Sequence, residues 1–422
     1  MEANRHLADA LSEAGLTQDE LAEAVNDYLR SLGREGTVSD RTVRHWLTGK
    51  TRWPHPRQRE ALEAVFGRTA GELGFTPPAG RRLPARTEDP VHRRNFLTAA
   101  TGTATSAVVP LIASRPYSVG TTDVIRLRSG LDALTALDAT RGGHEALERA
   151  ALAGAAEALD LQKRAASQRI RQRLFSVAAN YTASAAWSAV DARQSDRALT
   201  HLNRALYLAG MGKDPVAELR VWNSHAMLAV HRGEFSQAVD AGQAAQASAV
   251  TRRDPLFASL AHARTAIGHS VVGDRRGALR SLGYAEDALG KASPDEARPS
   301  WVAFYGPAEL LAITAYVRDD IGDAAGAEAA SHRALAAIPK QFRRNRALAT
   351  LQLALTQLHQ RDVDQACATA DQVFALMAGD PLPGRMRSYL GDFLRDLITL
   401  APDSGTAREW EDRYRSEWSQ AR

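Results

Sequence analysis

The chain has 422 residues, of which 44% are hydrophobic and 6% aromatic, and its formal net charge at pH 7 is +4. A chain of this length exceeds one small domain and is typical of two or three. The single cysteine, Cys367, excludes an internal disulfide framework and is typical of the reducing cytoplasm. Alanine is abundant, which favours closely packed helices, so the expected fold class is all-α.

Charge is unevenly distributed near the start of the chain. Residues 1–29 contain seven acidic side chains and one arginine, whereas residues 41–59 contain six lysines or arginines and no acid. Such a separation is typical of a surface that binds a polyanion. A solvated charged surface without a partner is the alternative interpretation.

Helical patterns follow one another up to residue 75. Residues 5–14 predict a first helix, and the capping box TQDE, which starts at Thr17, predicts the beginning of a second. Residues 57–66 predict a fourth helix after two prolines, and residues 69–73 predict a short fifth.

The third expected helix has two different faces. Ser39 is its expected N-cap, Gly49 is expected to end it in a left-handed conformation, and Val43, Trp46 and Leu47 share an inward face. Polar and basic groups occupy the other face and the segment that follows: Asp40, Arg41, Arg44, His45, Lys50, Arg52, Arg57 and Arg59. This order predicts groups that read bases, flanked by groups that neutralise phosphates.

Two stretches, GLTQDELAEAV and VRHWLTGKTRWP, resemble the Cro/lambda-repressor type of helix-turn-helix, the XRE family. The resemblance implies a five-helix DNA-binding domain over residues 1–75, with its third helix in the major groove. It implies base contacts for Asp40, Arg41 and His45 and backbone contacts for Lys50 and Arg52. The interface expected in full comprises Gln18, Ser39, Asp40, Arg41, Thr42, Arg44, His45, Lys50 and Arg52. The connection over residues 30–38 is longer than the tight turn of the family.

Residues 76–121 are rich in proline, glycine and arginine in their first part, which predicts a linker. Within it, RRNFL beginning at Arg93 and the apolar run TAATGTATSAVVPLIA look like a twin-arginine export signal. A true signal opens the chain, so we expect a cytoplasmic linker or docking helix here and no membrane partner. A membrane-associated remnant is the alternative.

A repeat of helical hairpins is expected over residues 122–422. Alanines recur with steps of 40, 40, 49 and 39 residues at Ala198, Ala238, Ala278, Ala327 and Ala366. Twelve residues before each stands a second alanine, at Ala186, Ala226, Ala266, Ala315 and Ala354, and seven residues after the first four stand Ala205, Ala245, Ala285 and Ala334. Small side chains at constant offsets let helices pack closely.

These offsets resemble the tetratricopeptide repeat, which implies an α-solenoid after the linker. The whole chain resembles actinobacterial XRE regulators with such repeats. The resemblance implies a cytoplasmic transcriptional regulator that binds double-stranded DNA as a homodimer and senses a peptide or small-molecule effector. The alternative is an interaction scaffold that uses the N-terminal domain for docking. Catalytic, cofactor and metal motifs are absent from the sequence, so no enzyme is expected.

In such solenoids the first helix of each pair lines the concave side. By this register the candidate effector-binding residues are Asn180, Trp187, Arg220, Asn223, Met227 and Tyr316. Asparagine amides suit a peptide backbone and arginine suits a carboxylate, which favours a peptide or a small organic molecule.

Overall fold

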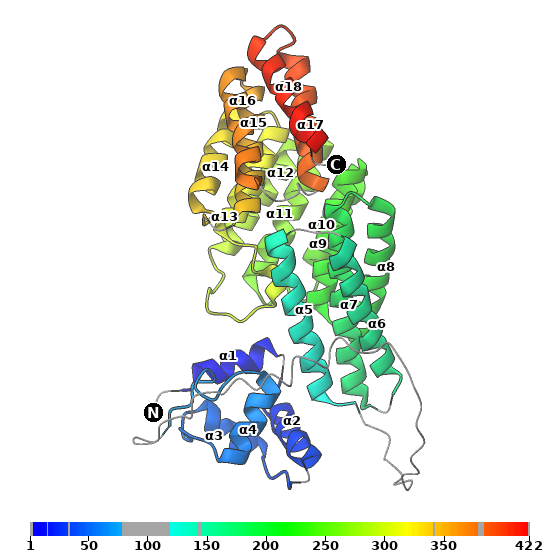
Figure 1. Ribbon diagram of the computed structural model, residues 1–422, viewed down its shortest axis with the longest axis vertical. Coiled ribbons are helices and arrows are strands. Elements are labelled where there is room, and N and C mark those ends of the chain that lie inside the picture. The colour runs from blue at the N-terminus through cyan, green and yellow to red at the C-terminus, as the bar shows by residue number, and fades with distance from the viewer. Residues whose placement is uncertain are drawn as a thin grey trace. The chain divides into compact units, whose positions relative to one another are not determined.

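A computed structural model describes the chain over residues 3–14, 16–32, 34–77, 119–141, 145–164, 166–340, 342–378 and 384–420. In these ranges it contains eighteen α-helices, one short 3-10 helix and no strand (Figure 1). The all-α fold class is therefore confirmed. The chain divides into two compact units, Met1–Thr122 and Asp123–Arg422. The RRNFL segment and most of the expected linker lie outside the described residues.

The helices of the first unit are α1 (Arg5–Glu13), α2 (Gln18–Ser31), α3 (Asp40–Leu47) and α4 (Pro56–Phe66). They enclose a core of fully buried side chains that includes Leu7, Leu21, Trp46, Leu62 and Leu73. Each contributing helix places these residues on one face, so burying them removes apolar surface from water and holds the unit together.

The expected fifth helix over residues 69–73 is a turn and not a helix. The amide of Phe75 donates to the carbonyl of Ala70 across Gly74, which has a left-handed φ of +77°. The Asn4 side chain donates to the carbonyl of Leu73 at 3.0 Å, so α1 ties down the turn. These contacts close the segment after a single turn, which the local sequence pattern did not indicate.

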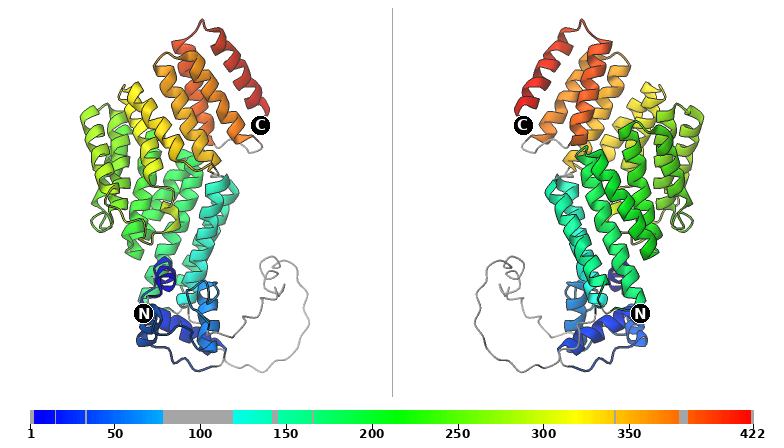
Figure 2. Two further views of the ribbon diagram at one scale, coloured as in Figure 1. Left: turned by 90° about the vertical axis from the view of Figure 1, so that its left-hand side faces the viewer. Right: turned by 90° about the vertical axis from the view of Figure 1, so that its right-hand side faces the viewer.

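The helices from α5 onward are α5 (Thr121–Arg141), α6 (Glu145–Gln162), α7 (Gln168–Asp191), α8 (Ser195–Gly212), α9 (Pro215–Arg232), α10 (Phe235–Ala247), α11 (Pro255–Val272), α12 (Arg275–Leu289), η2 (Ser300–Val302), α13 (Pro307–Asp320), α14 (Ala324–Ala337), α15 (Arg343–His359), α16 (Val363–Met377), α17 (Gly384–Leu400) and α18 (Gly405–Gln420). From α6 to α16 each α-helix packs against the next, and the odd-numbered helices from α7 to α17 also pack against one another in order (Figure 2). The odd-numbered helices therefore form one layer of the second unit.

The recurring alanines lie where these helices meet. Every alanine of the three offset series is at most 2% exposed. The first series lies on even-numbered helices and the series twelve residues earlier on odd-numbered ones, so each repeat is one pair of helices. Space is equally tight at Gly268, where a methyl group would come within 2.8 Å of the Val239 amide nitrogen. Small side chains are needed because the helix backbones approach closely.

A left-handed residue ends the first helix of every repeat pair. Glycine fills this place three times, and arginine fills it at Arg193 and Arg361, with φ of 61° and 69°. Both arginines donate to α17: Arg193 to the Ser388 hydroxyl at 2.5 Å and Arg361 to the Leu400 carbonyl at 2.9 Å. Their side-chain bonds to α17 offset the cost of a left-handed conformation outside glycine.

None of the helices within the described ranges is both long and apolar enough to cross a lipid bilayer.

Candidate nucleic-acid interface and the inner helix layer

Helix α3 begins and ends where the sequence predicts. Ser39 and Thr42 form a reciprocal cap, in which each side-chain oxygen accepts from the other residue's amide at 3.4 Å. Gly49, with φ of 70°, follows the helix in the left-handed conformation that residues with a side chain adopt at a cost. The hydroxyls of Ser39 and Thr42 are therefore engaged in capping, and their part in the expected interface is to hold the start of α3.

The inward face of α3 anchors the helix rigidly. Val43 and Trp46 are fully buried, and the Trp46 ring meets the edge of Phe75 at 6.5 Å. The long connection before α3 is held by Asn26, whose side chain donates to the Val38 carbonyl at 2.7 Å and accepts from the Val38 amide at 2.9 Å. These two hydrogen bonds fix the backbone immediately before Ser39 and so position the first turn of α3.

The opposite face of α3 presents charge to solvent. Asp40, Arg41 and Arg44 are exposed and His45 is half-buried. Asp40 and Arg44 form an ion pair at 3.4 Å, and the second Asp40 oxygen accepts from the Arg41 amide at 2.6 Å. The guanidinium of Arg41 has no hydrogen-bond or ion-pair partner within the described ranges, so its donors are available to a ligand.

The segment after α3 is held by its backbone while its basic side chains stay exposed. The Thr51 amide donates to the His45 carbonyl and the Thr76 amide to the Arg52 carbonyl, both at 3.0 Å. Lys50 and Arg52 are exposed. Arg59, in contrast, lies over the Trp53 ring at 4.4 Å and donates to the Pro54 carbonyl.

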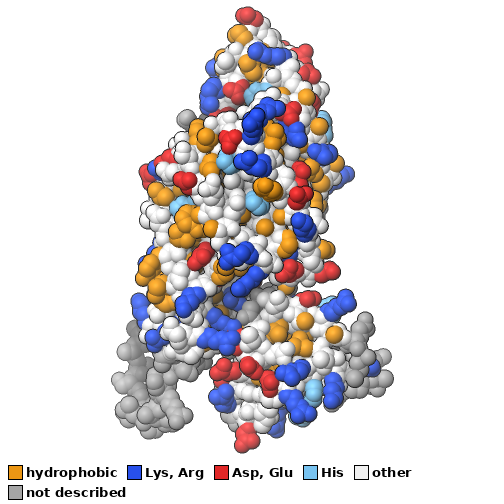
Figure 3. Space-filling model, turned by 180° about the vertical axis from the view of Figure 1, so that it is seen from behind, with side chains coloured by type: hydrophobic (Ala, Val, Ile, Leu, Met, Phe, Trp, Pro, Cys, Tyr) orange, Lys and Arg blue, Asp and Glu red, His pale blue; other side chains and the backbone are white. Residues whose placement is uncertain are grey.

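Gln18, the remaining expected contact, is the first residue of α2, where it follows the capping box of Thr17 and Glu20. In the part of the chain that the structure describes, no hydrogen bond or ion pair joins Gln18 to the candidate residues of α3. On the face drawn in Figure 3, acidic and basic side chains of the first unit gather in separate groups. Grouping of this kind leaves a positive surface that an anion can approach.

The candidate effector-binding residues lie on odd-numbered helices of the second unit, and four of them are bonded into two neighbouring groups. Arg220 is buried and donates to the Asn180 carbonyl at 3.0 Å, the Asn180 side-chain oxygen at 3.1 Å and the Ser184 hydroxyl at 2.8 Å. Arg264 donates to the Asn223 side-chain oxygen at 2.7 Å and contacts the Met227 sulfur at 3.3 Å. Polar atoms expected to meet an effector thus bind other side chains of the same layer instead.

Burial acts on both arginines of this layer. It lowers the pKa of Arg220 to about 10, against the opposing charges of Asp138 and Asp132, and it lowers the pKa of Arg264. Arg220 nevertheless keeps its positive charge at neutral pH, because a pKa near 10 lies well above 7. Its guanidinium also lies 5.5 Å from the centre of the Trp301 ring.

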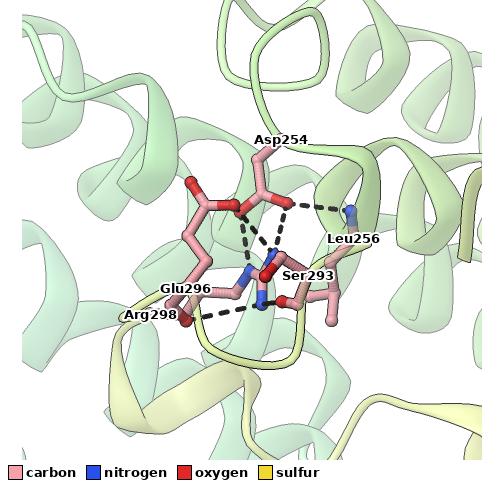
Figure 4. Close-up of polar contacts among 5 residues, drawn as sticks. All are labelled: Asp254, Leu256, Ser293, Glu296 and Arg298. Carbon is pink, nitrogen blue, oxygen red and sulfur yellow. Dashed lines mark hydrogen bonds and ion pairs between the residues drawn. The ribbon is translucent and has the colours of Figure 1, made fainter. Parts of the chain in front are cut away.

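The loop between α12 and α13 places Trp301 beside the Arg220 guanidinium, and an ion pair holds the loop (Figure 4). Arg298 donates to both oxygens of Asp254, at 2.7 and 2.9 Å, and to the Ser293 carbonyl at 2.8 Å. Asp254 also caps α11 by accepting from the Leu256 amide. This bidentate pair fixes the inserted residues that lengthen the third repeat.

An ionic cluster that sequence reasoning missed joins α7 to α15 and α17. Asp191 is 0% exposed and accepts a hydrogen bond from Arg344, and Arg385 forms an ion pair with it at 3.4 Å. Arg385 also lies 5.5 Å from the centre of the Trp187 ring. Trp187 and Tyr316 pack against the apolar cluster of α9 to α13, and burial raises the pKa of Tyr316 well above its usual value. The residues of the ionic cluster are far apart in sequence, so no local sequence pattern indicates that they meet.

A protein-family model matches the first part of the chain. Residues 7–74 match the model of a family described as the SP15 N-terminal domain. The match extends from α1 to the turn after α4 and so covers the helices of the first unit. No curated protein matches the chain.

Proposed function

We propose that the protein is a sequence-specific transcriptional regulator that binds double-stranded DNA through α3 in the manner of a helix-turn-helix domain. The observation that carries the proposal is the division of α3 into two faces. Val43 and Trp46 are buried, while Arg41, Arg44 and the following Lys50 and Arg52 are exposed. A short helix that is rigidly anchored and exposes arginines at its first turn suits major-groove contacts.

We further propose that the second unit is a tetratricopeptide-like solenoid that senses a peptide or small-molecule effector or mediates oligomerisation. The alanine register, the left-handed turn in each repeat and the layer of odd-numbered helices support this interpretation. A helix-turn-helix protein commonly binds two half-sites one DNA turn apart, so we propose a homodimer in the cytoplasm. A protein-interaction scaffold is the second candidate, because the same helix pairs suit partner binding.

Gel-shift titration of genomic DNA fragments at graded salt tests the DNA-binding half. We expect Arg41→Ala to weaken binding by about 1–3 kcal/mol, roughly 5- to 150-fold, because it removes a base contact. Lys50→Ala should reduce the slope of log affinity against log salt by about 1, because it removes one phosphate contact.

The matched control is Arg30→Ala. Arg30 is an exposed arginine of α2 that pairs with Asp27 at 2.8 Å and lies outside the proposed interface. Its loss should leave DNA affinity within twofold of the unaltered protein. Absence of any shifted fragment, or equal losses for Arg30→Ala and Arg41→Ala, would overturn the proposal and favour the scaffold.

A further inference from the structure

A cavity of about 370 Å³ lies among α8, α9 and α10 of the second unit, apart from the residues proposed above to bind an effector. Its apolar lining includes Leu199 of α8 and Ala241 and Ala244 of α10, and α9 contributes the rings of Trp222 and His225. The ring centres of Trp222 and His225 lie 5.3 Å apart. The volume falls in the range of roughly 300–1,000 Å³ that is typical of sites for small organic molecules.

The next repeat shows what this kind of space accommodates. The 40-residue step that relates Ala226 to Ala266 also relates Trp222 to His262 and Ala244 to Tyr284. In that repeat the Tyr284 ring lies over His262, with ring centres 5.3 Å apart and planes inclined by 49°. The α10 helix has only the methyl group of Ala244 at this place. Part of the cavity is therefore the space that an aromatic ring occupies one repeat later.

The rim of the cavity carries excess negative charge. Arg232 is neutralised within the chain, because it donates to Glu234 and to Asp196, both at 2.9 Å. Asp240 is exposed and has no ion pair within the described part of the chain, and the corresponding position of the next repeat is Arg280. Burial lowers the pKa of His225 to about 4, so this ring is neutral at pH 7 and adds aromatic surface without charge.

We propose that this cavity binds a small aromatic amine, with its planar ring against Trp222 and His225 and its ammonium group beside Asp240. Aromatic rings stack favourably on tryptophan, and a carboxylate at the rim selects a cation over an anion. The inference rests on the effector-sensing half of the proposed function and names the chemistry of that effector. It does not depend on DNA binding.

Isothermal titration calorimetry of the full chain with tryptamine tests the inference. Two further probes separate its parts: indole-3-propionate has the same ring with a carboxylate, and butylamine has the ammonium without a ring. We expect tryptamine to bind at least tenfold more tightly than either, because only tryptamine can both stack on Trp222 and His225 and pair with Asp240. No binding, or equal affinity for tryptamine and indole-3-propionate, would overturn the proposal.

Variants locate the binding. Ala244→Tyr introduces the residue that the next repeat has at this place, so it should fill the cavity and weaken tryptamine binding at least tenfold. Ala247→Tyr adds the same side chain at an exposed position of α10 outside the lining and should leave binding unchanged. Asp240→Asn, at an exposed site where folding is not at risk, should reduce the preference for tryptamine over indole-3-propionate at least fivefold.

The outcomes also separate this inference from the proposed function. If Ala244→Tyr removes tryptamine binding and no DNA fragment shifts, the proposed amine site is supported and the DNA-binding half of the proposed function is refuted. The opposite outcome refutes only the proposed amine site. In that case a gel shift depends on Arg41, but tryptamine binding is absent or insensitive to Ala244→Tyr and Asp240→Asn.

Discussion

Helix α3 of the first unit and the odd-numbered helices of the second unit both carry arginines, but these arginines have opposite surroundings. The Arg44 side chain is 62% exposed, and its one ion pair is with Asp40 in its own helix. The Arg344 side chain is 10% exposed and pairs with Asp191, which the rest of the chain buries completely. The first kind of arginine has donors to offer a ligand, whereas the donors of the second are occupied by the chain itself.

The comparison explains why residue type alone does not identify a binding site. An exposed ion pair contributes about 0–1 kcal/mol to stability, because water solvates both charges almost as well. Removing one partner of a buried pair is far more damaging, because the remaining charge has no solvent. Mutations of these arginine pairs should therefore affect stability in the second unit and ligand affinity in the first.

The largest effect is expected from Asp191→Ala. The change leaves Arg344 and Arg385 buried without their common carboxylate, so we expect the free energy of unfolding of the second unit to fall by roughly 3–5 kcal/mol. Urea unfolding followed by circular dichroism measures this fall. The control is Asp196→Ala, since the Asp196 side chain is 98% exposed in its pair with Arg232, and its cost should stay below about 1 kcal/mol. Equal costs for the two variants would show that the cluster does not hold α7 to α15 and α17.

A smaller effect on the stability of the second unit is expected from a change of pH, through His231 in the layer of odd-numbered helices. Burial, followed by the charges of Arg193 and Arg385, lowers the pKa of His231 to about 3. The unfolded chain takes up the proton near pH 6.5, so the contribution of His231 to stability is present above pH 6.5 and is lost as the pH falls towards 3. At pH 5 the loss attributable to this residue is about 2 kcal/mol.

The variant His231→Gln isolates that contribution. Its free energy of unfolding should fall less than that of the unaltered protein between pH 7 and pH 5, by about 2 kcal/mol. The comparison uses urea unfolding at both pH values. Parallel pH profiles for the two proteins would contradict a buried, neutral His231.

The smallest effect is expected at the exposed surface, from Asp40→Asn. The change releases Arg44 from its ion pair and removes a negative charge that would face phosphates, so DNA affinity should rise a few-fold at low salt. Helix stability should fall by only a few tenths of a kcal/mol, because an acid at a helix N-terminus is mildly favourable. Fluorescence anisotropy with a fragment bound in the gel shift measures the gain, and Asp27→Asn on α2 serves as the control. A loss of affinity confined to particular sequences would instead assign Asp40 a base contact to cytosine.

Local signals in the sequence predicted much of the architecture. The caps at Thr17 and Ser39 and the left-handed Gly49 depend on contacts within a few residues, and all three are confirmed. The alanine spacing predicted the helix pairs, because close helix packing requires small side chains at regular intervals. The prediction of a fifth helix was wrong: the segment is a turn that closes at the left-handed Gly74, and Asn4, distant in sequence, bonds to it.

The candidate sites were predicted unevenly for the same reason. Exposure of Arg41 follows from the periodicity of α3, and Lys50 and Arg52 lie in the basic segment just after the end of that helix, so sequence reasoning sufficed. For Arg220 and Asn223, periodicity predicted the layer on which they lie but not their partners. Those partners come from other helices of the array, and helical periodicity carries no information about them.

The sequence by itself determined the helices, their caps and the period of the array, because hydrogen bonds and side-chain spacing along one helix are local. Only the tertiary structure decided which charges are exposed and which are engaged. Asp191 meets Arg344 and Arg385 because α7, α15 and α17 converge, and the open space beside Trp222 exists because Ala244, not a tyrosine, faces it from α10. Burial and pairing depend on neighbours distant in sequence. Arginine side chains can therefore be available to a ligand in one unit and hold helices together in the other.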